Sequence, residues 1–192
     1  MALLVPVPWH PPGVDAHAWR AALAEDVVDL LARLAQAEPA IAAVPADRDL
    51  AEEIAWPGMR IYQVPTATVL PVFEAAAKDG FDQAAVVAAD AADVPGMILG
   101  KLLRPLTTKP VAVAPAGPGG GLLGVATHLP APAWLPDHDL DTGSPTGLRK
   151  SAPQPSDVQS TADWRRLRTA ADLATLDPAL EGWETTRALL GG

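Results

Sequence analysis

The chain has 192 residues, 49% of them hydrophobic, and a formal net charge of −9. This length and apolar content suit one domain with a core of its own. The acidic balance, with no dense cluster of Lys and Arg, argues against nucleic acid or an anionic membrane as a partner. With no cysteine in the chain, disulfides, thiolate catalysis and cysteine-ligated metals are excluded.

The N-terminal segment MALLVPVPWHPPG has neither the basic start nor the cleavage site of a signal peptide. No apolar run approaches the roughly 18 residues that a membrane helix needs. We therefore expect a cytoplasmic protein without a membrane partner.

Strands and helices alternate through the first 130 residues of the sequence. We expect apolar strands at 2–8, 40–45, 59–65, 81–90, 109–116 and 122–130. We expect helices after Asp15, after Asp47 or Asp49, over 67–80 and over 95–106. Because the strands are apolar throughout rather than alternating, helices should cover both faces of the sheet. The order predicts an α/β fold, a three-layer α/β/α sandwich with a mixed, mostly parallel central sheet.

The pattern loosens over 130–192, which we interpret as a C-terminal part of the same single domain, 1–192. Ser144 and Thr169 have the sequence context of helix N-caps. A weak strand is expected at 155–159. Asp177-Pro178 should begin a last amphipathic helix, with Leu180, Trp183 and Leu190 facing inward.

Two acidic residues, Asp90 and Asp93, follow the most strongly apolar strand of the chain, in AAVVAADAADVPG. Ligands of open α/β sheets bind at the carboxyl ends of strands, and Mg²⁺ is held by one or two carboxylates together with substrate phosphates. Asp90 is therefore a candidate metal and nucleotide ligand, and Asp93 a second candidate metal ligand. The alternative is structural: Asp93 would cap the helix that Pro95 begins, and Asp90 would accept hydrogen bonds from nearby backbone amides.

The glycine loop GPGGG, with Gly119, Gly120 and Gly121, would let backbone amides approach an anion or a sugar closely. A plain turn between two strands is the alternative. The acidic segment DHDLDTGS at 137–144 could add metal ligands or be a solvated loop. His10 follows the first strand, where a substrate could be met.

Familiar catalytic motifs are missing from the sequence. There is no GxSxG elbow, no GxxxxGK[ST] loop and no histidine spacing typical of a metal site. The literal GxGxxG match in GGGLLG precedes a β-like segment, whereas a dinucleotide fingerprint must open a helix.

Three stretches resemble the GT-A-type nucleotide-diphospho-sugar transferase superfamily over roughly residues 1–175: VVAADAADVPG, VAVAPAGPGGGLLGVA and RLRTAADL. They look like the D-x-P-D-L-P-type turn, the acceptor-facing glycine segment and the C-terminal D-x-D-T-x-x-D-L segment of that superfamily. The pattern is similar to its small bacterial members, which include glycosyltransferase-like proteins, molybdenum-cofactor nucleotidyltransferases and phospholactate guanylyltransferases.

The resemblance implies a nucleotide or nucleotide sugar as ligand, with Mg²⁺ or Mn²⁺ at Asp90. The first loop, with Pro8, His10 and Gly13, would contact the nucleotide, and Gly119, Gly120 and Gly121 would bound the acceptor pocket. Whether the chain forms a homodimer is left open by the sequence.

The sequence departs from this family at the residues that handle charge. The first loop has no Lys or Arg before Arg20, the glycine segment has Pro118 in place of an acidic residue, and Arg166 and Arg168 stand where two aspartates are expected. A triphosphate carries about four negative charges and needs basic donors. Arg166 or Arg168 could supply that charge from another direction.

Three hypotheses follow from the sequence. The first is a divergent nucleotidyltransferase or glycosyltransferase-like protein. The second is a catalytically degenerate transferase-like fold that acts as a binding or partner protein. The third, a Rossmann-like module of another superfamily, would require a parallel sheet that continues past residue 115.

Overall fold

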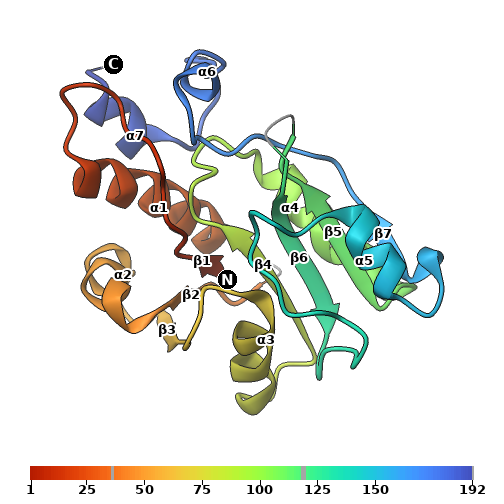
Figure 1. The fold of residues 1–192 in the computed structure, drawn as a ribbon. Helices are drawn as coiled ribbons and strands as arrows, with labels where there is room; N and C mark the ends of the chain where they lie inside the picture. The colour runs from red at the N-terminus through yellow and green to blue at the C-terminus, as the bar shows by residue number, and fades with distance from the viewer. Residues whose placement is uncertain (36, 118–119, 192) are drawn as a thin grey trace.

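A computed structural model describes residues 1–35, 37–117 and 120–191 of the chain (Figure 1). Its centre is a seven-stranded sheet in the order β3-β2-β1-β4-β6-β5-β7, in which only β6 runs antiparallel to its neighbours. The strands are β1 (Ala2–Leu3), β2 (Ala40–Ala43), β3 (Arg60–Gln63), β4 (Gln83–Ala88), β5 (Val111–Pro115), β6 (Leu122–His128) and β7 (Val158–Ser160). The predicted mixed, mostly parallel sheet is confirmed.

Helices pack on both faces of this sheet. The helices of the described residues are α1 (Ala16–Ala32), α2 (Arg48–Ile54), α3 (Val69–Lys78), α4 (Gly96–Leu103), α5 (Pro145–Ser151), α6 (Ala170–Leu173) and α7 (Glu184–Leu189), of which α1 to α5 pack on the sheet. Apolar residues of α1, α2 and α4 form one buried cluster with one face of the sheet, and residues of α3 and α5 form a second cluster with the other. Alternate residues of β5 enter the two clusters, which explains why this strand is apolar at every position.

A third buried cluster joins the two ends of the chain. Its members, which we call the tryptophan cluster, are Trp19, Leu23, Ala92, Leu167 and Trp183. The cluster ties α1 and the loop after β4 to the C-terminal segment, so the part of the chain after residue 160 packs on the main domain.

The strand order reverses at β1, which lies between β2 and β4. In open α/β sheets the crevice beyond the carboxyl ends of such strands is the usual ligand site. Asp90 follows β4 by two residues and therefore lies at this edge.

Side-chain caps begin three helices where the sequence predicted them. Asp15 Oδ1 accepts a hydrogen bond from Ala18 N at 2.9 Å, Ser144 Oγ accepts one from Gly147 N at 3.0 Å, and Thr169 Oγ1 accepts one from Asp172 N at 3.2 Å. Each cap satisfies a backbone donor that would otherwise have no intrahelical partner.

The predicted first strand, 2–8, is too long. β1 ends at Leu3, and the last hydrogen bond that continues its pairing with β2 is from Leu4 N to Ala42 O. Pro6 and Pro8 follow within a few residues, and proline has no N–H to donate to a sheet.

The predicted start of the last helix is also wrong. Asp177 accepts a hydrogen bond from Ala179 N in a turn, and α7 begins only at Glu184. Its first turn is instead held by the buried carboxylate of Asp26 on α1, which accepts hydrogen bonds from Thr185 N and Thr186 N at 2.9 Å each. Trp183 is buried as expected, but Leu190 is 36% exposed.

No helix in the described part of the chain has both the length and the apolar character needed to cross a bilayer.

Candidate functional site

Asp90 is completely buried at the carboxyl edge of the sheet, and an arginine holds it on both oxygens. Arg166 Nε donates to Asp90 Oδ1 at 2.6 Å, and Arg166 Nη2 donates to Oδ2 at 2.9 Å. The backbone follows the same route, because Leu167 N donates to Asp90 O at 2.8 Å. This two-point geometry matches the guanidinium fork to the carboxylate.

The Arg166 guanidinium is almost as deeply buried as its partner and also reaches a second carboxylate. Its Nη1 lies 2.8 Å from Asp141 Oδ1 and also donates to Leu140 O at 3.3 Å. Burial alone would lower the pKa of Arg166, but the charges of Asp90 and Asp141 outweigh it and hold that pKa above its ordinary value. Arg166 is therefore charged at every pH of interest.

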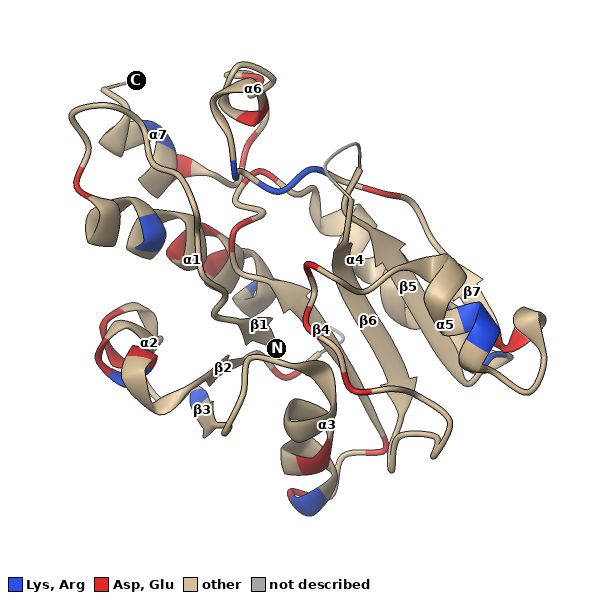
Figure 2. Cartoon of the chain, in the orientation of Figure 1, with Lys and Arg blue, Asp and Glu red and all other residues tan. Residues whose placement is uncertain are grey.

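Arg168 completes the network from the same segment. Its Nη1 and Nη2 donate to Asp141 Oδ1 and Oδ2 at 2.7 and 2.9 Å, and its Nε lies 3.7 Å from Asp90 Oδ2. Figure 2 shows this basic stretch between β7 and α6, near the acidic loop that follows β4. Arg166 and Arg168, which stand where the resemblance predicts aspartates, thus both face carboxylates.

Asp93 does not cap α4, so the alternative prediction that it caps the helix begun by Pro95 is wrong. The helix begins at Gly96 after Pro95, and no side-chain hydrogen bond caps its first turn. Asp93 instead accepts hydrogen bonds from Trp164 Nε1 at 3.2 Å and from Arg165 Nη2. Burial raises the pKa of the Asp93 carboxyl, although the hydrogen bond from Trp164 and the charge of Arg165 partly offset this effect.

The charges of this site balance. The carboxylates of Asp90, Asp93 and Asp141 face the guanidinium groups of Arg165, Arg166 and Arg168, three of each sign. We call these six residues the arginine–aspartate network.

The network, as arranged, does not fit a divalent cation. Both oxygens of Asp90 already accept hydrogen bonds from Arg166, whose positive charge would repel a cation at this carboxylate. Among the described residues, no group of three or more His, Asp or Glu side chains is placed to hold a metal. The Mg²⁺ or Mn²⁺ expected at Asp90 and Asp93 stays a prediction.

Two glycines of the glycine loop, Gly117 and Gly121, lie against other backbone segments at this edge. A side chain at Gly121 would place its Cβ 2.6 Å from Leu140 O, and the φ of Gly121 is +81°. Gly117 lies against the backbone of Arg165. Of the predicted acceptor-side glycines, Gly120 is exposed with φ +74°, and Gly119 is outside the described residues. Gly121 is therefore required by close packing, and a role toward an acceptor stays a prediction.

The first loop has two sides. Pro8, His10 and Gly13, the predicted nucleotide contacts, are exposed to solvent, and the His10 Nδ1 lies 3.4 Å from Pro11 O. Their apolar neighbours Val7, Trp9 and Val14 pack against the tryptophan cluster. Within the residues that the structure describes, no hydrogen bond or ion pair joins these three exposed residues to Asp90, and their role in nucleotide binding stays a prediction.

Arg20, the first basic residue after this loop, is already engaged. Its Nη1 and Nη2 donate to the two oxygens of Asp47 at 2.6 and 2.7 Å, and its Nε donates to Val5 O. It fixes α1 to the end of β1 rather than presenting a charge to a phosphate.

The acidic segment 137–144 holds backbone rather than forming a metal site. Asp137 accepts hydrogen bonds from Thr68 Oγ1 and Leu70 N at the start of α3. Asp139 accepts from Asp141 N and Thr142 N and so closes a turn. The sequence did not predict that Asp141 pairs with Arg166 and Arg168, or that the buried Asp26 holds the first turn of α7.

A scan against protein families and a search of curated proteins found no match. Solved structures do match the fold. A protein from Desulfovibrio desulfuricans G20, described as a nucleotide-diphospho-sugar transferase, superposes with a TM-score of 0.62 at 20% identity, over 97% of this chain and 94% of that one. The 4-diphosphocytidyl-2C-methyl-D-erythritol synthase of Anaerococcus prevotii DSM 20548 gives 0.54 at 11% identity, over 88% and 86%.

The chain therefore has a nucleotidyltransferase-like α/β fold over almost its whole length. This confirms the resemblance predicted from the three sequence stretches at the level of the fold. Fold and activity are separate properties, because activity depends on the residues at the site.

Proposed function

We propose that this chain is a transferase-like fold that does not carry out metal-dependent transfer and acts as a binding or partner protein. The observation that carries the proposal is the bidentate pair of Arg166 with the fully buried Asp90. A guanidinium takes the position that a divalent cation would need, so Asp90 is neutralised by the chain itself.

Displacing Arg166 would be costly. Removing one partner of a buried ion pair costs about 3–5 kcal/mol, because the other charge is left uncompensated. A metal ion would have to offset this cost and also release the contacts of Arg166 with Asp141 and Leu140. Mg²⁺ bound by one or two carboxylates takes its remaining ligands from substrate phosphates and from water.

The cations that could hold those phosphates are also occupied. Arg165, Arg166 and Arg168 pair with the three carboxylates of the network, and Arg20 pairs with Asp47. Charge-assisted hydrogen bonds from such donors are the strong contacts of a phosphate site. With these arginines engaged, the network offers a triphosphate no excess positive charge.

A second candidate is a metal-dependent nucleotidyltransferase or glycosyltransferase. It is favoured by the fold of the two neighbours, whose descriptions name a nucleotide-diphospho-sugar transferase and a diphosphocytidyl synthase. Asp90, with Asp93, would then hold Mg²⁺ or Mn²⁺ against a nucleotide or nucleotide sugar near Pro8, His10 and Gly13. This function requires that Arg166 leave Asp90 when the ligand binds.

A ligand screen separates the two candidates. Thermal unfolding and calorimetry would be run with CTP, GTP, UTP and nucleotide sugars, each with and without Mg²⁺ or Mn²⁺. A ligand at 100 times its dissociation constant stabilises the folded state by about 2.7 kcal/mol. We expect no stabilisation that requires the metal. A metal-dependent shift that Asp90→Asn removes, while the variant stays folded, would refute the proposal in favour of the second candidate.

A further inference from the structure

A cavity of about 300 Å³ lies at the opposite edge of the sheet from Asp90. Its wall includes the first residues of β2, β3 and β4 and the last turns of α1 and α4. The strand pairing explains the space. Ala2 pairs with Val87, whereas β4 reaches back to Gln83, so β4 extends past the start of its neighbour β1.

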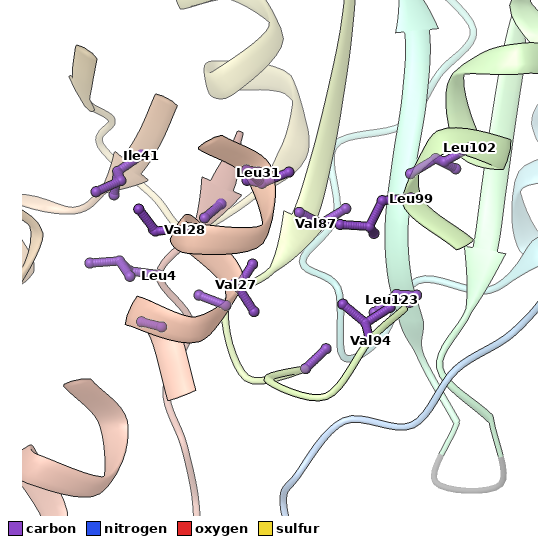
Figure 3. Close-up of a cluster of buried hydrophobic side chains, with 14 of the residues drawn as sticks. Leu4, Val27, Val28, Leu31, Ile41, Val87, Val94, Leu99, Leu102 and Leu123 are labelled. Atoms are coloured by element: carbon purple, nitrogen blue, oxygen red, sulfur yellow. The ribbon is translucent and has the colours of Figure 1, made fainter. Parts of the chain in front are cut away.

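The wall of the cavity is mostly apolar. Figure 3 shows Val87 of β4 between Leu31 of α1 and Leu99 of α4, and these three residues line the cavity. Leu102 and Phe81 add further apolar surface. Ligand pockets in proteins begin at about this volume and are lined mainly by hydrophobic side chains.

Three polar residues of the wall, Glu38, Arg60 and Tyr62, form one group with the neighbouring Asp79, and the Met1 amino group, also in the wall, donates to Ala85 O at 2.7 Å. Arg60 Nε lies 3.1 Å from Glu38 Oε1, and its Nη1 lies 2.8 Å from Asp79 Oδ2. Tyr62 donates to the same Asp79 oxygen at 2.8 Å, and the Arg60 guanidinium lies 5.3 Å from the centre of the Phe81 ring. One guanidinium thus faces two carboxylates, and the group does not favour an anionic ligand.

We propose that this cavity binds a small uncharged molecule. Its body would be a cyclic or branched hydrocarbon about as large as two or three fused rings. A cavity of about 150 Å³ lined by apolar side chains binds benzene, and this one has twice that volume. Gln83 is a further polar residue of the wall, and its Nε2 lies 3.5 Å from His128 Nδ1. The inference does not rest on the proposed function, because the arginine–aspartate network lies at the other edge of the sheet.

The test uses 1-aminoanthracene, an uncharged fluorescent three-ring molecule, titrated into the full chain. We expect saturable fluorescence enhancement with one site per chain. Ala85→Phe would place a ring in the cavity and should weaken binding at least tenfold. Ala171→Phe, at an exposed position on α6, is the matched control and should bind as the unmodified chain does.

Ala37→Phe is a second variant that would fill the cavity, at a partly exposed position of the wall. It replaces Ala85→Phe in the test if circular dichroism shows that Ala85→Phe is not folded. Absence of saturable binding, or equal binding by a folded filling variant and by Ala171→Phe, would overturn the proposal. A titration with anionic 1-anilinonaphthalene-8-sulfonate checks the charge argument. This anion should bind more weakly than 1-aminoanthracene, and tighter binding that the filling variants abolish would contradict the proposed uncharged ligand.

Discussion

The pair of Asp90 and Arg166 can be tested by removing its cation. Arg166→Met keeps much of the side-chain volume but leaves the fully buried Asp90 carboxylate without its two donors. Breaking a buried pair in this way costs about 3–5 kcal/mol. Because Arg168 Nε stays 3.7 Å from Asp90 Oδ2, we expect a value near the lower limit.

The assay is chemical denaturation at neutral pH, followed by tryptophan fluorescence and supported by thermal melts. A loss of about 3 kcal/mol in a domain of this size lowers Tm by roughly 6–12 °C. The matched control is Arg48→Met, which breaks a solvent-exposed pair with Glu52 and should lower stability far less than Arg166→Met does.

A double variant separates the charge from the packing. Adding Asp90→Asn to Arg166→Met removes the stranded carboxylate, so the double variant should be more stable than Arg166→Met alone. A loss below about 1 kcal/mol for Arg166→Met, or a double variant less stable than the single, would refute the reasoning that an uncompensated charge sets the cost.

Two further predictions concern the packing around the site. Gly121→Ala should destabilise the chain by about 2 kcal/mol or more in denaturant unfolding, because φ is +81° and the new Cβ would meet Leu140 O. The control Gly100→Ala, in α4 with open space around it, should stabilise the chain by about 0.5–1 kcal/mol. Equal effects of the two substitutions would contradict the close packing at Gly121. Burial raises the pKa of Asp26, so the native chain binds that proton more tightly than the unfolded chain, and the contribution of Asp26 to stability declines as pH rises through the raised pKa. Asp26→Asn should remove that decline from the stability–pH curve measured by denaturation, and an unchanged curve would show that Asp26 does not cause it.

The fold was predictable because its signals are local and agree with one another. Strands such as β4 and β5 are apolar on both faces, and Asp15, Ser144 and Thr169 begin helices through caps that involve only neighbouring residues. These features need no knowledge of distant contacts.

The chemistry of the site was less predictable because its contacts are remote in sequence. Asp90 and Arg166 are separated by 76 positions, and the sequence leaves open which of several partners a buried carboxylate finds. One signal was present: basic residues stand at 166 and 168 where carboxylates are expected. A buried carboxylate at a strand end needs a cation as partner. The two arginines, which depart from the pattern of the superfamily that the sequence resembles, were candidates for that partner.

The prediction of where the last helix begins was wrong for a related reason. Asp177-Pro178 is a good local start signal, but the first turn of α7 is fixed by Asp26, far away on α1. Tertiary contacts therefore override the local pattern at this end of the chain.

We propose that Arg166 takes the place of a divalent cation at Asp90. The most direct measurement is Mn²⁺ binding followed by electron paramagnetic resonance, with CTP, GTP or UTP present, on the unmodified chain and on Asp90→Asn. We expect the two proteins to bind the same amount of Mn²⁺. One Mn²⁺ per chain bound by the unmodified protein and lost in a folded Asp90→Asn variant would contradict it.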